Sequence, residues 1–282
     1  MNNRISVLIQ YILPKQALTT LAGKLANLEA GTLTTAVIEW FVKRYNVNML
    51  EAVDPNISSY KTFNEFFTRP LKADARPLVN ADFICPVDGA ISQFGNIETD
   101  QIFQAKGHLY STGALLGGDT QAAKPYENGS FACLYLSPKD YHRIHMPCAG
   151  RLLKMTYVPG ALFSVNPATA QGVPGLFARN ERVMCEFHSE KHGNFVMVLV
   201  GATIVGSMAT VWHGIVNPPR SSNIRTWHYE QQNIQLQQGE EMGRFLLGST
   251  VIILFEKNRI QFNKIWNPAK FVQLGEAMGT KP

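Results

Sequence analysis

The 282-residue sequence has few cysteines and no run of basic residues. The four cysteines (Cys85, Cys133, Cys148 and Cys185) show no C-x-x-C spacing and lie in apolar or mixed surroundings. We expect reduced core residues in a cytoplasmic compartment rather than a disulfide framework. The formal net charge of +5 is mild, and no cluster of lysine and arginine predicts a nucleic-acid partner.

Long apolar segments are absent as well. A membrane-spanning helix needs about 20 mostly apolar residues, and the stretch VMVLVGATIVG at 196–206 is too short and too rich in β-branched residues. The N-terminus has one early arginine and an apolar run that stops at Pro14, which does not fit a secretory signal. The protein is expected not to be transmembrane.

Signatures of common cofactor and metal sites are also missing. The sequence contains no G-x-G pair, Walker A loop, H-E-x-x-H motif or G-x-S-x-G motif. His188 and His192 could bind a metal together if they lay on a helix. Their context, CEFHSEKHGNF, is more typical of a strand end followed by a charged turn. We therefore predict no metal site.

The first part of the chain has helical periodicity. Leu18, Leu21, Leu25 and Leu28 recur on one face of residues 15–29, and TLTTAVIEWFVKRYN at 32–46 forms a second amphipathic pattern, after a short helical segment at 5–13. Such helices either pack on their own domain or lie in the headgroup region of a bilayer, where tryptophan, lysine and arginine are favoured at the edges. Both interpretations stay open, and they are compatible.

From about residue 83, short β-rich runs alternate with turns and no βαβ rhythm occurs. The runs are GAISQFGNI, SFACLYLS, GRLLKMTYV, RVMCEFHS, NFVMVLVGATIVGSMATVW, NIQLQQGEEMGRF and STVIILFEK. This spacing is typical of an antiparallel sandwich or barrel. We predict an α+β fold, with an N-terminal helical, membrane-associating region at 1–59 and a mainly antiparallel, sandwich or barrel-like catalytic domain at 60–282.

Two segments contain candidate catalytic side chains. LYLSPKDYHRIHMP at 134–147 places Asp140, His142, Arg143 and His145 within six positions. Along a strand the two histidines would lie on opposite faces, which suggests different roles. In the second segment, CPVDGAIS at 85–92, Asp88 is typical of a turn before a strand.

The stretch FLLGSTVIILFE at 245–256 reads as one buried strand that Gly-Ser-Thr interrupts. Gly-Ser also occurs at 129–130 and 206–207, so the dipeptide alone predicts nothing. One interpretation is a bulge, since glycine weakens a strand. The other is self-cleavage, in which a serine hydroxyl attacks the preceding carbonyl beside a base and glycine leaves room for the attack. A histidine oriented by an aspartate is the usual means of activating such a serine.

Together, LSPKDYHRIHMP, CPVDGAIS, NERV, VGATIVGSM and EMGRFLLGSTVI resemble the phosphatidylserine decarboxylases of the short bacterial type. The resemblance extends from YKTFNEFFTRPLK to the FEK after Gly-Ser-Thr, with no departure at the catalytic positions. It implies that Asp88, His145 and Ser249 form a triad for self-cleavage, in which His145 is the base and Asp88 orients it. Ser249 would attack the Gly248 carbonyl and, after elimination and hydrolysis, become a pyruvoyl group.

The resemblance also implies what the processed protein does. Residues 1–248 and 249–282 become the β and α chains of a heterodimer, with further dimerisation left open. The pyruvoyl group at Ser249 is the covalent cofactor; it forms a Schiff base with phosphatidylserine and takes the electron-sink role of pyridoxal phosphate. The products are phosphatidylethanolamine and CO2, in phospholipid biosynthesis. His142 is expected near the prosthetic group, where it positions substrate or transfers a proton.

A lipid substrate implies peripheral attachment to an anionic membrane surface, on the cytoplasmic face of a bacterial cell membrane. Deletion of residues 1–46 is expected to detach the protein from vesicles while self-cleavage continues. Three alternatives stay open: a pyruvoyl decarboxylase of a soluble amino acid, a self-processing amidohydrolase that keeps its N-terminal nucleophile, and an uncleaved β-sandwich lipid-binding protein.

Overall fold

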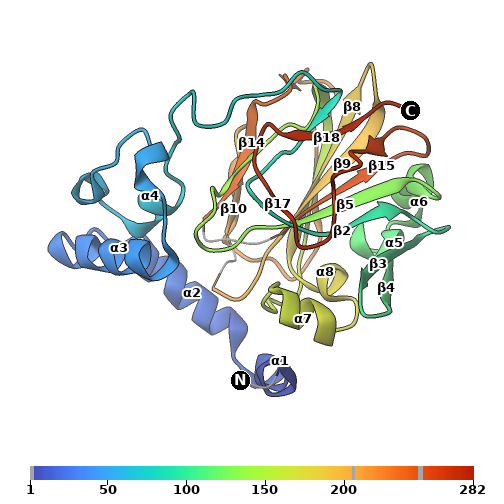
Figure 1. Ribbon diagram of the computed structural model, residues 1–282. Helices are drawn as coiled ribbons and strands as arrows, with labels where there is room; N and C mark the ends of the chain where they lie inside the picture. The colour runs from blue at the N-terminus through green and yellow to red at the C-terminus, as the bar shows by residue number, and fades with distance from the viewer. Residues whose placement is uncertain (1–2, 205–206, 247–249) are drawn as a thin grey trace.

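The computed structural model describes residues 3–204, 207–246 and 250–282 and confirms the three predicted N-terminal helices. They are α1 (Asn3–Ile12), α2 (Lys15–Ala26) and α3 (Thr32–Tyr45). Pro14 separates α1 from α2, since proline has no N–H for the helical ladder. Asn46 ends α3 in the left-handed conformation that is common at helix C-termini. The three helices extend along one side of a β-rich body (Figure 1).

Most apolar side chains that the structure describes in these helices and in the loop after α2 are exposed. The exposed large ones are Leu8, Tyr11, Ile12, Leu18, Leu21, Leu25, Leu28, Leu33, Val37 and Trp40. In α2 and α3 the buried residues are Thr19, Ala26, Thr34 and Ile38. Packing on the chain's own domain therefore accounts for only part of the apolar faces, and the remainder is available to another apolar partner.

A short helix, α4 (Phe63–Phe67), joins the N-terminal helices to the body. Thr62 and Glu65 form a capping box that fixes its start. Phe66 and Phe67 pack with Ile38, Val47 and Ala26 in one apolar cluster. This cluster joins residues on both sides of the predicted boundary at 59/60, which stays a prediction. The turns η1 (Met49–Glu51) and η2 (Ile57–Ser59) lie between α3 and α4.

The body is built on a nine-stranded antiparallel sheet. Its order is β12-β7-β8-β9-β15-β5-β2-β17, with β13 also paired to β7. The strands are β2 (Gly89–Asn96), β5 (Ser130–Tyr135), β7 (Gly150–Val158), β8 (Arg182–Ser189), β9 (Gly193–Val200), β12 (Arg225–His228), β13 (Gln235–Leu236), β15 (Thr250–Phe255) and β17 (Phe271–Val272). All six residues of β15 are buried, as expected for a strand covered on both faces. The turn predicted around His188 and His192 is confirmed between β8 and β9.

A second sheet packs on one face of the first. It contains β6 (Arg143–His145), β10 (Met208–Thr210), β11 (Gly214–Asn217) and β14 (Glu241–Phe245), in the order β11-β10-β14-β6. Ile144, Met208 and Phe245 from this sheet share a core with Met155 and Met197 from the large sheet. The predicted α+β class is confirmed, with a sandwich-like core; none of the sheets in the described residues closes into a barrel.

The other face of the large sheet is covered by short elements that the sequence did not predict. They are the hairpin β3 (Gln101–Ala105) and β4 (His108–Ser111) and the short helices α5 (Thr112–Leu115), α6 (Thr120–Ala123), η3 (Lys124–Tyr126), α7 (Pro167–Gly172) and α8 (Leu176–Arg179). Their apolar residues form a second core with β9 and β15. A small sheet, β1 (Phe83–Ile84), β18 (Ala277–Thr280) and β16 (Gln261–Phe262), completes the body. All four cysteines are free and buried, as predicted.

The stretch FLLGSTVIILFE is two strands in different sheets rather than one interrupted strand. β14 ends at Phe245 in the four-stranded sheet, and β15 begins at Thr250 in the nine-stranded sheet. The predicted cleavage site, Gly248-Ser249, lies outside the described residues. The chain therefore changes sheets at the segment that contains this site.

Candidate active site

Backbone pairing brings the two candidate catalytic segments beside the strand that leads to residues 247–249. Strand β14 pairs with β6, and the Phe245 N–H donates to the His142 carbonyl at 3.0 Å. The His145 N–H donates to the Pro86 carbonyl at 2.9 Å, which places the CPVDG turn on the other side of β6. Residues far apart in sequence thus meet at one place.

The described residues on either side of Gly248-Ser249 are held by their backbones. The Leu246 N–H donates to the Ser207 carbonyl at 3.0 Å. Thr250 pairs with Tyr135 on one side and Val200 on the other. Its buried hydroxyl has no hydrogen-bond partner among the described residues. An unpartnered buried hydroxyl is costly, which makes Thr250 a candidate site residue.

His142 is fully buried and neutral. Its Nδ1 lies 2.7 Å from the Asp140 carbonyl oxygen, which can only accept, so Nδ1 carries the proton and Nε2 is an acceptor. This Nε2 has no partner in the described part of the chain. The imidazole stacks against Phe67, with ring centroids 4.1 Å apart. Burial, assisted by the positive charge of Arg69 and opposed by the Asp140 carbonyl, lowers the pKa of His142 to about 3.

This lowered pKa predicts an acid-sensitive contribution to stability. The unfolded chain protonates His142 near pH 6.5, whereas the folded chain does so near 3, so the unfolded state binds more protons between these values. Each pH unit lost in that window should lower the free energy of unfolding by about 1.4 kcal/mol through this group. The free energy of unfolding in urea should be measured at pH 6 and 4.5 for His142→Gln and for its parent, both in a Ser249→Ala background that keeps the protein a single chain. The decrease between the two pH values should be smaller for His142→Gln. Equal pH effects would contradict the assignment.

His145 is also held as a neutral acceptor. Its Nδ1 lies 2.8 Å from the Gly239 carbonyl oxygen and therefore carries the proton, and its Nε2 lies 3.3 Å from the Tyr141 hydroxyl. Burial raises the pKa of Tyr141 to about 12, so this hydroxyl keeps its proton and donates it to Nε2. Burial is also the main cause that lowers the pKa of His145, against the opposing effect of the Gly239 carbonyl.

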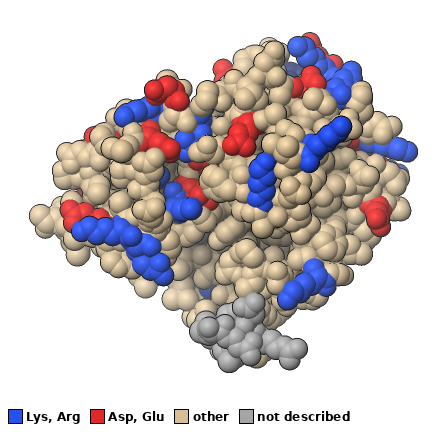
Figure 2. All heavy atoms as spheres, in the orientation of Figure 1, with Lys and Arg blue, Asp and Glu red and all other residues tan. Residues whose placement is uncertain are grey.

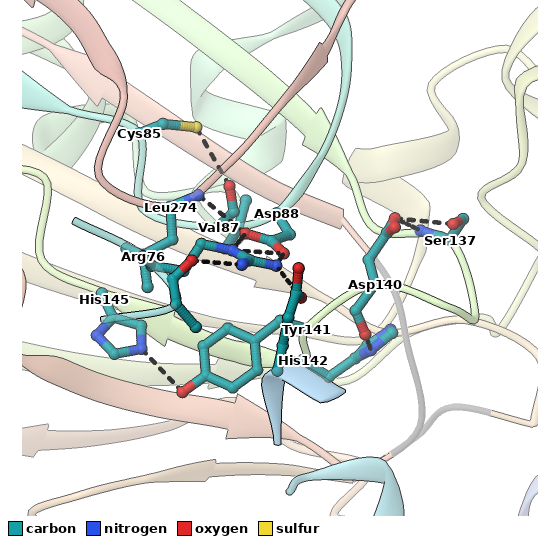
Figure 3. A network of polar contacts seen from close by, with 12 residues as sticks. Arg76, Cys85, Val87, Asp88, Ser137, Asp140, Tyr141, His142, His145 and Leu274 are labelled. Carbon is teal, nitrogen blue, oxygen red and sulfur yellow. Dashed lines mark hydrogen bonds and ion pairs between the residues drawn. The ribbon is translucent and has the colours of Figure 1, made fainter. Parts of the chain in front are cut away.

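Asp88 lies in the same site but makes no hydrogen bond to His145. Its carboxylate accepts from Arg76 at 2.5 to 3.0 Å and from the Leu274 N–H at 2.9 Å. Figure 3 shows the Arg76 guanidinium against Asp88, while His145 is directed toward the Tyr141 hydroxyl. The hydrogen bond at His145 Nδ1 goes to the Gly239 carbonyl. The orientation of His145 by Asp88 stays a prediction.

Four of the residues that shape this site were not predicted from the sequence: Arg69, Arg76, Tyr141 and Gly239. Tyr141 lies inside the motif DYHRIH, so its place in the sequence could have indicated a residue of the site. Gly239 acts through its backbone carbonyl and gives no side-chain signal at all. Arg76 lies 12 residues before its partner Asp88, in a loop that resembles any polar connection.

An apolar groove of about 590 Å³ lies beside Phe67, whose ring contacts the His142 imidazole. The loop after α2 and helix α3 form one wall, with Leu28, Leu33 and Trp40, and the body forms the other, with Tyr135 and Leu136. Phe67, which stacks on His142, lines the same groove, and Tyr135 pairs with Thr250. The groove therefore ends close to the candidate catalytic groups.

Across the described residues, no helix is long and apolar enough to cross a membrane. Within the same residues, no group of three or more histidine, cysteine, aspartate or glutamate side chains could hold a metal ion.

Two neutral histidines with Nε2 acceptors, near an apolar groove and a change of sheet, are groups of the kind that an enzyme active site uses for proton transfer. The family model described as phosphatidylserine decarboxylase matches residues 63–280, and one described as PSD matches residues 5–46. The chain belongs to the phosphatidylserine decarboxylase family.

The similarity to individual family members extends over almost the whole chain. The phosphatidylserine decarboxylase proenzyme of Dechloromonas aromatica (strain RCB) is 69% identical over 280 residues, which cover 99% of each chain. That of Methylobacillus flagellatus (strain ATCC 51484 / DSM 6875 / VKM B-1610 / KT) is 69% identical over 97% of this chain and 98% of its own. That of Albidiferax ferrireducens (strain ATCC BAA-621 / DSM 15236 / T118) is 66% identical over 100% and 99%. Each is named a proenzyme.

Proposed function

We propose that this protein cleaves itself between Gly248 and Ser249 and then decarboxylates phosphatidylserine to phosphatidylethanolamine. The observation that carries the proposal is that β14, which ends at Phe245, pairs with the strand that carries His145 and bonds to the His142 carbonyl, near an apolar groove. The names of the relatives, which describe a decarboxylase proenzyme, support both steps.

In the proposed self-cleavage, His145 acts as the base. Its Nε2 lone pair would take the Ser249 hydroxyl proton as that oxygen attacks the Gly248 carbonyl, and the amide nitrogen would leave to give an ester. The Gly239 carbonyl would hold the imidazole in the required tautomer and stabilise the imidazolium that forms. β-Elimination would then break the Cβ–Oγ bond, which releases residues 1–248 with a Gly248 carboxylate and leaves dehydroalanine at 249. Water would replace the nitrogen of that residue, so that ammonia leaves and a pyruvoyl group remains.

The described residues fit a polar group at position 249. A pyruvoyl group there would supply the electron-accepting carbonyl that amino-acid decarboxylation needs. His142 Nε2 and the Thr250 hydroxyl are both buried and unpartnered, so they are available to hold a proton and to orient such a group. His142 is then assigned proton transfer or substrate positioning after cleavage, and His145 is assigned the cleavage itself.

The two product chains are proposed to stay together as a heterodimer. Strand β15, which belongs to the 249–282 product, pairs with β5 and β9 over all six of its residues. It lies inside the nine-stranded sheet, so its removal would open both neighbouring ladders and two apolar cores. Cleavage of one peptide bond removes none of these contacts.

We also propose a peripheral location on an anionic membrane surface, with the cytoplasmic face of a bacterial membrane kept as the expected side. The exposed apolar side chains of α1 to α3 and the adjoining groove support this location. Figure 2 shows basic side chains, with an acidic one beside them, on otherwise uncharged surface where Figure 1 places α2 and α3, and Lys43 and Arg44 lie in the last turn of α3. Apolar insertion together with peripheral positive charge is the pattern of helices that lie on a bilayer.

Substitution tests this attachment more cleanly than deletion of residues 1–46. A deletion would also remove the contact of Thr19 with the Ile204 N–H and uncover Phe66 and Phe67. Ile12 and Leu21 are 85% and 55% exposed and do not line the groove. Ile12→Gln with Leu21→Gln should lower co-sedimentation with phosphatidylglycerol-containing vesicles by about tenfold, because two apolar insertions are lost.

The matched control is Ile265→Gln, which changes a residue that is 58% exposed outside the N-terminal helices. It should leave vesicle binding unchanged, and all variants should still cleave themselves. Equal vesicle binding by the double variant and the wild type would contradict the proposed surface.

The substrate class is tested by a direct comparison. CO2 release from phosphatidylserine and from free serine should be measured with the same cleaved preparation. We expect release from the lipid only, because the apolar groove contributes binding that free serine cannot use. Equal rates with free serine would favour the soluble-amino-acid alternative.

A further inference from the structure

Arg69 is a buried charge without an adequate acceptor. It is 4% exposed, and its one hydrogen bond is a long contact of 3.5 Å from Nη1 to the Phe66 carbonyl. Its Nε has no partner, and no carboxylate in the described part of the chain lies within ion-pair distance of the guanidinium. A buried cation normally has paired anions or several carbonyl acceptors. Arg69 therefore needs a hydrogen-bond acceptor that the described residues do not supply.

Arg182 shows how the same fold satisfies a buried arginine. It is 2% exposed and donates to the carbonyls of Leu115, Ala114, Ala178 and Asn180 at 2.6 to 2.8 Å. The two side chains are similarly buried, so they differ in the number of hydrogen-bond acceptors around each guanidinium. We take the missing acceptors of Arg69 as the mark of a ligand.

A polar cavity of about 160 Å³ lies against Arg69. Lys139, Tyr141, Asn46, Asn48 and Gln273 also line it, and all can donate hydrogen bonds. This volume is enough for a small oxyanion or a few water molecules.

Three carboxylates also line the cavity, and both oxygens of Asp88, Oε2 of Glu51 and Oδ2 of Asp140 accept hydrogen bonds from other groups of the chain. Arg76 binds both Glu51 and Asp88. Asp140 accepts from the N–H and the hydroxyl of Ser137 at 2.7 and 2.8 Å. Arg69 and the exposed Lys139 have no ion pair in the described part of the chain, and Lys139 Nζ lies 5.9 Å from the centroid of the Phe271 ring.

The polar cavity adjoins the apolar groove along two chain segments. Tyr45 lines the groove and Asn46 lines the cavity; Pro138 lines the groove and Lys139 lines the cavity. A ligand that occupies both must be apolar at one end and anionic at the other. Phosphate oxyanions are ligands that arginine and lysine bind well.

We propose that Arg69 and Lys139 bind the phosphodiester of the lipid headgroup. The inference rests on the proposed function, since phosphatidylserine has both a phosphodiester and a carboxylate. The carboxylate is the poorer candidate, because a cation that stabilised it would oppose its loss as CO2. The phosphodiester is unchanged by the reaction, so a fixed clamp on it holds substrate without raising the barrier.

The test measures KM and kcat on cleaved protein with a short-chain, soluble phosphatidylserine. Lys139→Gln changes an exposed residue and should raise KM about tenfold, the effect of one lost charge-assisted bond, with kcat within about twofold of wild type. Arg69→Gln should raise KM more, and Arg69→Lys should recover part of the loss. Lys264→Gln, another exposed lysine outside the cavity, should match wild type. If the Arg69 variants do not fold, the comparison of Lys139→Gln with Lys264→Gln still tests the proposal.

Inhibition experiments identify the bound group. Short-chain phosphatidylethanolamine keeps the phosphodiester and lacks the carboxylate, so its inhibition constant should rise in Lys139→Gln as much as KM does. Unchanged phosphatidylethanolamine inhibition with a raised KM would assign the carboxylate instead and overturn the proposal. Inorganic phosphate that binds wild type but not the variant, with KM unchanged, would show a free-phosphate site and also overturn it. A wild type that cleaves but releases no CO2 would refute the proposed function, separately from this inference.

Discussion

His145→Gln is expected to accumulate as the uncleaved 31.4 kDa chain. Glutamine can still donate to the Gly239 carbonyl and fill the space, but it has no basic nitrogen to accept the Ser249 proton. Loss of a general base costs about 10²- to 10⁴-fold in rate. A time course of fresh protein on a denaturing gel should show this slowing directly.

Tyr141→Phe is the matched control for His145→Gln. It removes the hydroxyl that lies 3.3 Å from His145 Nε2 but leaves the imidazole and its Gly239 contact, so cleavage should continue. Normal cleavage by His145→Gln would contradict the role of His145 as base.

Asp88→Asn should also slow cleavage, and Arg76→Gln distinguishes two reasons. If Asp88 acts through its ion pair with Arg76, which fixes the turn beside His145, both variants should slow cleavage to a similar extent. If Asp88 acts on His145 directly, Arg76→Gln should leave cleavage close to normal. Normal cleavage by Asp88→Asn would remove Asp88 from the triad altogether.

His142→Gln is expected to separate the two reactions. The variant should cleave itself but lose decarboxylation by about 10²- to 10⁴-fold, because the buried Nε2 acceptor is replaced by an amide without a usable basic nitrogen. The assay is CO2 release from phosphatidylserine by protein whose complete cleavage has been checked on a gel.

Phe67→Leu is the control for His142→Gln, because it changes the ring that stacks on the imidazole while Nδ1 stays bonded to Asp140. We expect a smaller loss from it, within about tenfold, since packing is altered and the acceptor is kept. Full decarboxylation by His142→Gln would show that His142 does not transfer a proton or position substrate.

The sequence was sufficient for the fold class and for the helices and strands with strong periodicity. Leu18, Leu21 and Leu25 predicted α2, and the apolar run from Thr250 to Phe255 predicted β15. Their patterns arise from local geometry and burial, which the sequence expresses directly. The short helices and hairpin over the second core escaped prediction, since they depend on caps such as Asn166 and on tertiary packing.

The site was only partly predictable for the same physical reason. His142, His145 and Asp88 stand in recognisable motifs, but the order of strands in two sheets decides which of them meet. The carbonyl of Gly239 and the ion pair of Arg76 come from distant loops, and no local pattern predicts either contact. The sequence from Phe245 onward has the pattern of one interrupted strand, which does not reveal that the chain changes sheets between Phe245 and Thr250.

The central claim, that Ser249 becomes a pyruvoyl group by self-cleavage, is tested most directly by intact mass. Wild-type protein should give a chain of residues 249–282 whose mass is one ammonia lower than that of the same peptide with an N-terminal serine. Ser249→Ala should give only the full chain. A small chain with an unmodified serine amine would favour an amidohydrolase, and an uncleaved but active wild type would contradict the account.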